Sequence, residues 1–125
     1  MSFIFRRLFS TTSAASMDSA AHKKAQQLID ENGVMVFSKS YCPYCKNTKR
    51  ILDGLNAKYK AYELNEESDG NELQSALLDI TGQRTVPNVF IGQKHIGGNS
   101  DLEAVAKNGK DGKSLKELLE AASAL

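Results

Sequence analysis

Side chains that bind metal ions are scarce in this sequence. Its 125 residues contain only two cysteines and two histidines, and His22 and His95 both lie far from the cysteines along the chain. A structural zinc ion takes about four such ligands at characteristic spacings. Zinc is therefore a poor fit, and we expect no metal in the protein.

A strong excess of charge and a long apolar run are missing as well. The net charge is +1, and without Arg6 and Arg7 the chain has 14 basic and 15 acidic residues. Proteins that bind nucleic acids usually carry a basic surface, so we expect no nucleic acid as a partner. The same two arginines interrupt the first apolar stretch after three residues, which excludes a secretory signal and a membrane span there. We expect no membrane as a partner either.

Acidic residues are absent from residues 1–17. This segment combines arginines with hydroxyl-bearing and bulky apolar residues, and the first acidic residue is Asp18. The composition is typical of a mitochondrial transit peptide, although a merely disordered tail would also fit it. We expect residues 1–17 to direct the protein to mitochondria, with the matrix as the destination, and residues 18–125 to form one domain. A start at Met17 would yield a second, cytoplasmic form.

Both cysteines occur together, in the sequence Cys-Pro-Tyr-Cys at residues 42–45. If this stretch begins a helix, Cys42 and Cys45 lie on one face with Cβ atoms roughly 5–6 Å apart, which suits a disulfide that forms and opens reversibly. A permanent structural disulfide is a weaker interpretation, because so small a loop would constrain the unfolded chain little. The pair is therefore a candidate redox-active disulfide.

The start of a helix also gives the two thiols different roles. Pro43 suits the first helical position, because it has no N–H group to leave unpaired. Cys42 would then meet free backbone N–H groups and the positive end of the helix dipole, which lower the pKa of a thiol. Cys45 would face the body of the protein one turn later. We expect both to be catalytic, with Cys42 as the nucleophile and Cys45 as the resolving thiol.

Apolar periodicity predicts a single α/β domain. A buried strand at 34–37, a helix at 43–57 and a weaker strand at 59–64 predict a right-handed βαβ unit with parallel strands. The cysteines would then lie at the carboxyl end of the first strand, the edge at which open α/β sheets bind their ligands. Further helices are predicted at 18–31, 69–82, 100–109 and from 114 onward, and a hairpin at 87–91 and 93–96.

Three of the predicted helices carry their own start signal. Asp69, Ser100 and Ser114 are each followed three residues later by Glu, as in a capping box. The resulting order α-β-α-β-α-β-β-α-α, with C-x-x-C after the first strand, resembles the thioredoxin-like fold. We therefore expect an α/β protein with a four-stranded mixed sheet flanked by about five helices.

Three stretches together resemble the dithiol glutaredoxins in their order and approximate spacing. They are Lys-Ser-Tyr-Cys-Pro-Tyr-Cys at residues 39–45, Thr-Val-Pro at 85–87 and Gly-Gly-Asn-Ser-Asp-Leu at 97–102. The resemblance extends from about residue 18 to the end of the chain. Thioredoxins differ because they carry Cys-Gly-Pro-Cys after a tryptophan, a residue that this chain lacks. Monothiol glutaredoxins carry Cys-Gly-Phe-Ser and do not match.

This resemblance implies a glutathione-binding site. Lys39 is similar to a family lysine that pairs with a glutathione carboxylate, and its charge would also favour the thiolate of Cys42. Tyr44 resembles a family tyrosine that lines the glutathione groove. Gln74 is similar to a glutamine that contacts the glycyl end of glutathione, and Arg84 would add charge in the same region.

The other two stretches imply further contacts with glutathione. A cis peptide bond between Val86 and Pro87 would face the cysteines, and the Val86 backbone would pair with glutathione like an added strand. Ser100 and Asp101 would begin a helix whose free N–H groups bind the γ-glutamyl carboxylate, with Asp101 near the γ-glutamyl ammonium. Ser100 could also be an ordinary helix cap, or be both.

The activity implied is that of a glutathione-dependent thiol–disulfide oxidoreductase, a monomer that uses glutathione as co-substrate. Its partners would be glutathionylated or disulfide-bonded proteins. One alternative is a carrier of a [2Fe-2S] cluster ligated by glutathione. Pro43 argues against it, because cluster-binding relatives tend to have a smaller or more flexible residue there. Another alternative is a protein-disulfide reductase that is fed by a second reductase rather than by glutathione.

Overall fold

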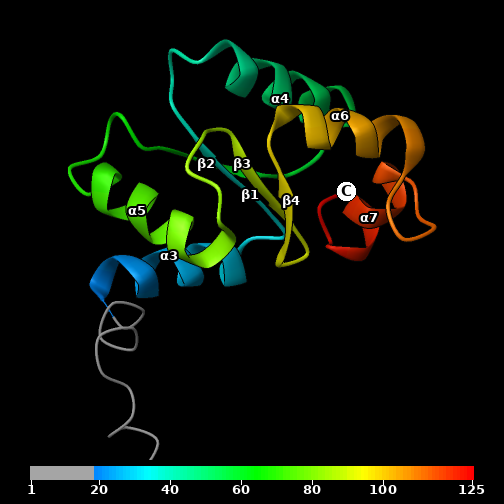
Figure 1. Ribbon diagram of the computed structural model, residues 1–125. Coiled ribbons are helices and arrows are strands. Elements are labelled where there is room, and N and C mark those ends of the chain that lie inside the picture. Colours follow the sequence, from blue (N-terminus) through cyan, green and yellow to red (C-terminus); the bar gives the residue numbers. More distant parts are fainter. Residues whose placement is uncertain (1–18) are drawn as a thin grey trace, which may run out of the picture.

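The computed structural model describes residues 19–125, which form one sheet covered by helices on both faces (Figure 1). The sheet has four strands in the order β2-β1-β3-β4. The predicted targeting segment at residues 1–17 lies outside the described residues. None of the described helices is long and apolar enough to cross a membrane. In chain order the elements are α3 (Ala20–Glu31), β1 (Val34–Ser38), α4 (Pro43–Gly54), β2 (Lys60–Glu63), α5 (Gly70–Thr81), β3 (Asn88–Ile91), β4 (Lys94–Gly97), α6 (Asn99–Asn108) and α7 (Leu115–Ala121).

Strand pairing within the sheet is mixed. β1 is parallel to β2, with α4 connecting the two, and it is antiparallel to β3. β3 and β4 form an antiparallel hairpin with a bulge between Val89 and Phe90. The hairpin turns at Gly92 and Gln93, both of which have positive φ. These pairings, together with the five helices of the described residues, confirm the predicted fold class and its parallel βαβ unit.

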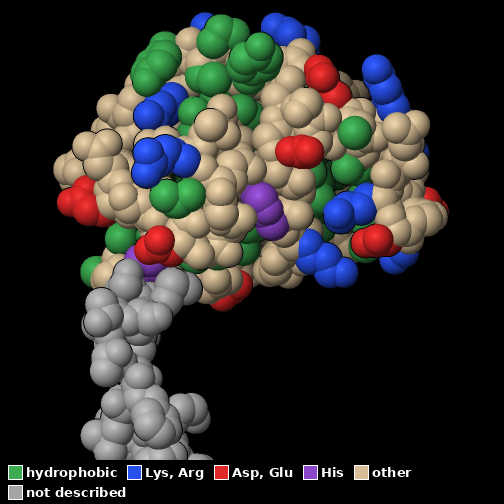
Figure 2. Space-filling view, viewed as in Figure 1, with side chains coloured by type: hydrophobic (Ala, Val, Ile, Leu, Met, Phe, Trp, Pro, Cys, Tyr) green, Lys and Arg blue, Asp and Glu red, His purple; other side chains and the backbone are tan. Residues whose placement is uncertain are grey.

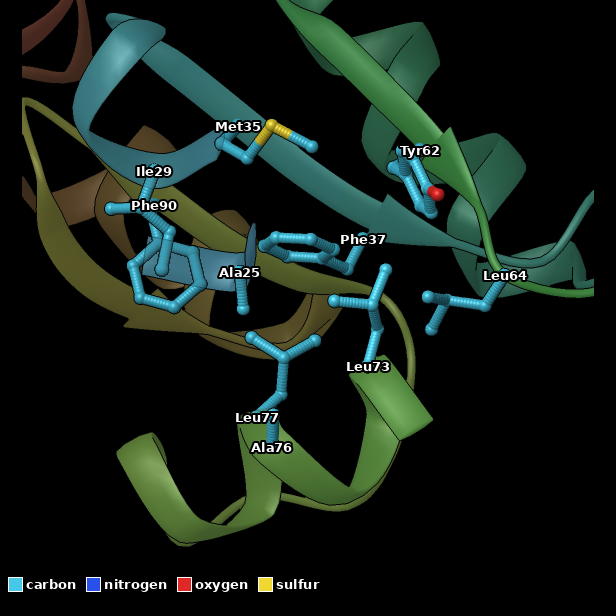
Figure 3. Close-up of a cluster of buried hydrophobic side chains, with 10 residues drawn as sticks. All are labelled: Ala25, Ile29, Met35, Phe37, Tyr62, Leu64, Leu73, Ala76, Leu77 and Phe90. Carbon is cyan, nitrogen blue, oxygen red and sulfur yellow. The ribbon is translucent and has the colours of Figure 1, made fainter. Parts of the chain in front are cut away.

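Side chains on the two faces of the sheet enter separate apolar cores. Phe37 and Phe90 pack with Leu73 and Leu77 of α5 on one face, where Figure 3 shows these side chains directed toward one another. Val36 belongs to the other core, which includes residues of α4, α6 and α7. Burying one large apolar side chain contributes roughly 1.5–3 kcal/mol, so the two cores hold the helix layers firmly on the sheet. As a result α4 and α6 share the face that carries the cysteines.

Helix α4 ends earlier than predicted. Apolar spacing predicted a helix as far as Ala57, but α4 ends at Gly54, and Asn56 takes a left-handed conformation with φ 58°. The N–H of Ala57 turns back to the carbonyl of Leu52. Tyr59 fits the helical spacing, but it packs against the core from the segment that leads into β2. An apolar residue at the right interval was therefore not enough to extend the helix.

One predicted capping box is confirmed and another is wrong. The Ser114 hydroxyl accepts a hydrogen bond from the N–H of Glu117, as predicted. Asp69 precedes α5, but its carboxylate accepts hydrogen bonds from Lys24 and Tyr62 and makes none to the helix. Asp69 therefore connects α5 to α3 and β2.

Candidate active site

The two cysteines lie between the end of β1 and the first turn of α4. Cys42 is the N-cap of the helix and Pro43 is its first residue, as predicted. The N–H of Cys45 donates to Cys42 Sγ over 3.4 Å. Cys45 is completely buried, Cys42 is partly exposed, and both are free thiols. One sulfur is therefore accessible from the surface and the other lies in the interior.

Opposing effects act on the Cys42 thiol. Burial raises its pKa, but the N–H and thiol of Cys45, the N–H of Tyr44 and the positive charge of Lys49 together hold that pKa below the ordinary value. The N–H groups of a first helical turn have no carbonyl partner within the helix, so they are free to act on the sulfur. The thiolate of Cys42, which is the nucleophilic form, is therefore favoured.

The Cys45 thiol shifts in the opposite direction. Burial raises its pKa and the neighbouring Cys42 raises it further, which outweighs the lowering by the N–H of Lys39 and the hydroxyl of Ser38. Cys45 is therefore a protonated thiol at neutral pH. This inequality supports the predicted roles, in which Cys42 reacts first and Cys45 second.

Lys49 is a lysine whose charge favours the Cys42 thiolate. The sequence predicted this effect for Lys39, which is not among the groups that chiefly set the pKa of Cys42. Lys49 lies one turn beyond Cys45 on α4, and its Nζ pairs with Glu63 Oε2 at 2.6 Å. The chain has several lysines near the cysteines, and the sequence does not show which of them faces the thiol.

A groove of about 570 Å³ lies beside the nucleophile, between the start of α4, the segment before β3 and the start of α6. The peptide bond between Val86 and Pro87 is cis, as predicted, and Cys42 Sγ lies 3.9 Å from the carbonyl oxygen of Val86. The three stretches predicted to form the site therefore meet at one place. The groove is lined by Tyr44, Gln83, Thr85, Val86, Pro87, Gly98, Asn99, Ser100, Asp101 and Glu103.

Two of the predicted glutathione-binding residues do not line this groove. Gln74 lines a separate hollow of about 270 Å³ together with Asn71, Ser75 and Arg84. Its side-chain amide donates to the carbonyl of Arg84 over 2.7 Å. Lys39 lines neither hollow and lies between β1 and Cys42. Of the residues predicted to bind glutathione, Gln74 and Lys39 thus lie outside the main groove, and the others line it.

Helix α6 begins one residue earlier than predicted, and Ser100 is not its cap. Gly98 is the N-cap, and Asp101 Oδ2 accepts a hydrogen bond from the Gly98 N–H at 2.8 Å. The capping box predicted for Ser100 is therefore wrong, and Ser100 lies exposed in the first turn. Gly97 has φ 123°, and a Cβ on it would overlap the Asp101 carboxylate. Glycine is thus required where Asp101 closes the turn.

Polar side chains without a predicted role link the walls of the groove. The amide of Gln83 donates to the carbonyls of Thr85 and Pro87, at 3.1 and 3.0 Å. Asn99 Oδ1 accepts a hydrogen bond from the buried Thr48 hydroxyl at 2.9 Å, which joins α6 to α4. The sequence carried two signals: Asn99 lies within the Gly-Gly-Asn-Ser-Asp-Leu stretch, and Thr48 is a polar residue at an apolar position of the helical pattern.

Metal ligands are not gathered in the described part of the chain. Between residues 19 and 125, no three side chains of His, Cys, Asp or Glu lie close enough together to share a metal ion.

Comparison with known proteins identifies the family. The glutaredoxin family model matches residues 34–96, a range that includes both cysteines and the Val86–Pro87 bond. The chain belongs to the glutaredoxin family. A glutaredoxin of Ricinus communis is 57% identical over 90 residues, which cover 72% of this chain and 88% of that one. Glutaredoxin-C2 of Arabidopsis thaliana is 52% identical over 101 residues, which cover 81% and 88% of the two chains.

Solved structures agree with this assignment. The buckwheat glutaredoxin–glutathione complex has a TM-score of 0.79 at 50% identity, covering 84% of this glutaredoxin and 92% of the buckwheat chain. Wheat glutaredoxin has a TM-score of 0.80 at 52% identity, covering 86% and 98%. Both the thioredoxin-like fold and membership of a family of glutathione-dependent thiol oxidoreductases are thereby established.

Replacing Lys49 should raise the pKa of the nucleophile. In the reduced protein, iodoacetamide should modify Cys42 with a half-maximal rate below about pH 8.5, the value for a free cysteine, and should leave Cys45 largely unmodified there. Lys49→Gln removes a cation that lowers the pKa, so its profile should move to higher pH. Lys39→Gln is the matched control and should move it less. Equal shifts, read by mass spectrometry of each cysteine, would contradict the assignment to Lys49.

Gly97→Ala should destabilise this glutaredoxin more than Gly112→Ala does. Both glycines have positive φ, 123° and 78°, but only Gly97 has a neighbour in the way of a Cβ. Backbone strain should cost each variant about 1–2 kcal/mol. The new Cβ in Gly97→Ala should also displace the Asp101 carboxylate and break its hydrogen bond with the Gly98 N–H. This loss should lower the free energy of unfolding by about 1 kcal/mol more. Urea denaturation measures both free energies of unfolding, and equal losses would contradict the role of the close contact.

Proposed function

We propose that this glutaredoxin reduces protein–glutathione mixed disulfides and protein disulfides through the thiolate of Cys42. The observation that carries the proposal is the position of Cys42, which is the N-cap of α4 with its sulfur beside the groove and 3.9 Å from the carbonyl oxygen of Val86. The N–H groups of that first turn help to lower the pKa of the Cys42 thiol. A thiolate attacks disulfide sulfur, and a groove next to it suits a peptide joined to that sulfur.

The proposed cycle begins when the Cys42 sulfur attacks the glutathione sulfur of a mixed disulfide. The new bond joins those two sulfurs, the old bond to the protein sulfur breaks, and the protein leaves as a thiolate that takes up a proton. A second glutathione thiolate then attacks the bound glutathione sulfur, which releases oxidised glutathione and restores the Cys42 thiolate. With a protein disulfide as substrate, the Cys42 thiolate attacks one sulfur of that disulfide, and the other protein sulfur leaves as a thiolate that takes up a proton. Cys45, after losing its proton, then attacks Cys42 Sγ, the bond from Cys42 Sγ to the protein sulfur breaks, and the protein leaves with both cysteines reduced. Two glutathione molecules reduce the Cys42–Cys45 disulfide that remains.

Glutathione recognition in this proposal relies on the backbone as well as on side chains. Among the backbone hydrogen bonds of residues 19–125 outside the helices and strands, none uses Val86, so its peptide groups can pair with an extended ligand. The first turn of α6, with Ser100 and Asp101, would bind the γ-glutamyl end. Gln74 and Lys39 would contact the glycyl end from outside the groove. A related protein of the same fold, buckwheat glutaredoxin, is solved as a glutathione complex.

Exposed aromatic side chains would contact the protein part of the substrate. Tyr41 and Tyr44 flank Cys42, and each is 66% exposed. Figure 2 shows hydrophobic side chains gathered at the surface over the start of α4, near the top of the view. Tyrosine offers a large apolar face together with a polar hydroxyl, which suits contacts with varied partners.

The two cysteines should differ sharply when each is replaced by serine. Cys42→Ser removes the nucleophile, so glutathione-coupled reduction of a glutathionylated peptide should fall at least about 10³-fold. Cys45→Ser leaves the first step and its rescue by glutathione intact, so activity on that peptide should stay within about tenfold of wild type. The same variant should lose reduction of a protein disulfide, which needs the resolving thiol. Equal loss of peptide reduction in both variants would contradict the proposed division of roles.

We also propose that residues 1–17 direct the protein to mitochondria and that a start at Met17 leaves it in the cytoplasm. The full chain with a fluorescent tag at its carboxyl end should enter mitochondria of living cells. Reversing Arg6 and Arg7 to Glu should abolish import, because transit peptides are rich in arginine and poor in acid. Reversing Lys107 and Lys116 makes the same charge change within the domain and should preserve import. Import of the Arg6 and Arg7 variant would contradict the proposal.

A further inference from the structure

Two buried polar atoms between the sheet and α4 have no hydrogen-bond partner among the described residues. They are Ser38 Oγ and Glu63 Oε1. Ser38 and Glu63 are Cα partners in the parallel register of β1 and β2. Residues paired in this way send their side chains to the same face of a sheet. Glu63 forms an ion pair with Lys49 of α4, so this face of the sheet is the one that α4 covers. Both unpaired atoms therefore lie beneath α4.

Cys45 occupies the same space. Cys45 and Ser38 are completely buried, and the Ser38 hydroxyl lies near enough to lower the pKa of the Cys45 thiol, although without full hydrogen-bond geometry. Lys49 follows one turn later and pairs with Glu63 Oε2 at 2.6 Å, with the two side chains 22% and 18% exposed. One oxygen of the Glu63 carboxylate is thus held by a cation, while the other is buried and free to accept a proton.

The resolving step needs such an acceptor. Cys45 is protonated at neutral pH because burial raises its pKa, yet only its thiolate can attack a disulfide. Solvent does not reach the Cys45 side chain, which has no exposed surface. An unpaired acceptor in the interior of a protein destabilises the fold, so such an atom usually has a function. Accepting the proton of Cys45 would be the function of Glu63 Oε1.

We propose that Glu63 accepts the proton of Cys45 when Cys45 attacks a mixed disulfide on Cys42, with the Ser38 hydroxyl, which is hydrogen-bonded to neither group in this structure, rotating to pass the proton between them. The inference rests on the proposed function, which supplies that mixed disulfide. The Cys45 proton moves to Ser38 Oγ while the Ser38 proton moves to Glu63 Oε1. Cys45 Sγ then bonds to Cys42 Sγ, the bond from Cys42 Sγ to the glutathione sulfur breaks, and glutathione leaves as a thiolate. Glu63, whose side chain is 18% exposed, afterwards returns the proton to solvent when its carboxyl group rotates.

The other titratable groups around Glu63 do not compete for this proton. Lys49 is a cation and has no acceptor atom. Burial and the hydrogen bond to Asp53 raise the pKa of Tyr59 to about 12, so the Tyr59 phenol stays protonated. It donates its hydrogen bond to the Asp53 carboxylate. Cys42 is part of a disulfide at this stage and carries no charge. Once Glu63 is protonated, the charge of Lys49 is no longer balanced and favours the negative charge developing on sulfur.

Single-turnover experiments on the full chain separate the resolving step from the first step. Reduced wild-type protein, Glu63→Gln and Glu67→Gln are each mixed with oxidised glutathione over a range of pH. Acid-quenched samples are analysed by mass spectrometry for the Cys42–glutathione disulfide and for the Cys42–Cys45 disulfide. Glu67 is a matched control, because it has the same charge and lies exposed in the turn after β2.

We expect Glu63→Gln to affect only the second step. Its mixed disulfide should form within about threefold of the wild-type rate, and conversion to the intramolecular disulfide should be slowed about 10²-fold near pH 7. The slowed step should recover roughly tenfold per pH unit, because each unit raises the fraction of Cys45 present as thiolate about tenfold without help from the carboxylate. Glu67→Gln should match wild type in both steps. Ser38→Ala keeps the ion pair between Glu63 and Lys49 and should also slow the second step alone.

Two outcomes would overturn the inference. One is conversion at the wild-type rate and with the wild-type pH profile in both Glu63→Gln and Ser38→Ala. The other is a uniform slowing of both steps at every pH in both variants, because a general structural defect would produce it. If the wild-type protein forms no Cys42–glutathione disulfide at all, the proposed function itself fails, so the two failures are distinguishable.

Discussion

Helix α4 rests on the sheet through Cys45, Thr48 and Leu52, all completely buried, and this contact sets the reactivity of both thiols. Burial raises the pKa of Cys45 because it lies within the contact. Cys42 precedes the first turn, where the N–H groups of that turn outweigh its partial burial and lower its pKa. Two thiols only three positions apart in the chain therefore differ in protonation, with the thiolate favoured at Cys42 and the protonated thiol at Cys45. Without the packing of α4, both thiols would lie in water and titrate alike.

The groove depends on the same helix. Thr48, inside the contact with the sheet, donates to Asn99 and so holds the start of α6 against α4. Gln83 braces the segment that contains Pro87. The first of these hydrogen bonds joins residues 51 positions apart, and the second stays within one loop. The elements that carry them are fixed on the sheet by the two apolar cores (Figures 1 and 3). Side chains of the active site are thus positioned by a rigid scaffold.

Predictions from the C-x-x-C motif were more accurate than predictions from apolar spacing or from the residue type of a single helix cap. The C-x-x-C spacing and Pro43 placed the thiols correctly, because backbone geometry alone relates positions i and i+3 of a helix. The end of α4 was predicted too late, because Asn56 reverses the chain where apolar spacing continues. Ser100 has the residue type of a helix cap, but Gly98 takes that place because Asp101 binds its N–H. Lys49 went unrecognised because the direction of its side chain depends on packing.

By itself the sequence determined the order of the helices and strands, the start of a helix between Cys42 and Pro43, and the resemblance to dithiol glutaredoxins. Each of these depends on residue types and intervals that are local to the chain. Only the tertiary structure decided that Ser38 and Glu63 lie side by side beneath α4, the helix that carries Cys45. Two strands must first adopt a register, and a helix must cover them, before residues 25 positions apart become neighbours.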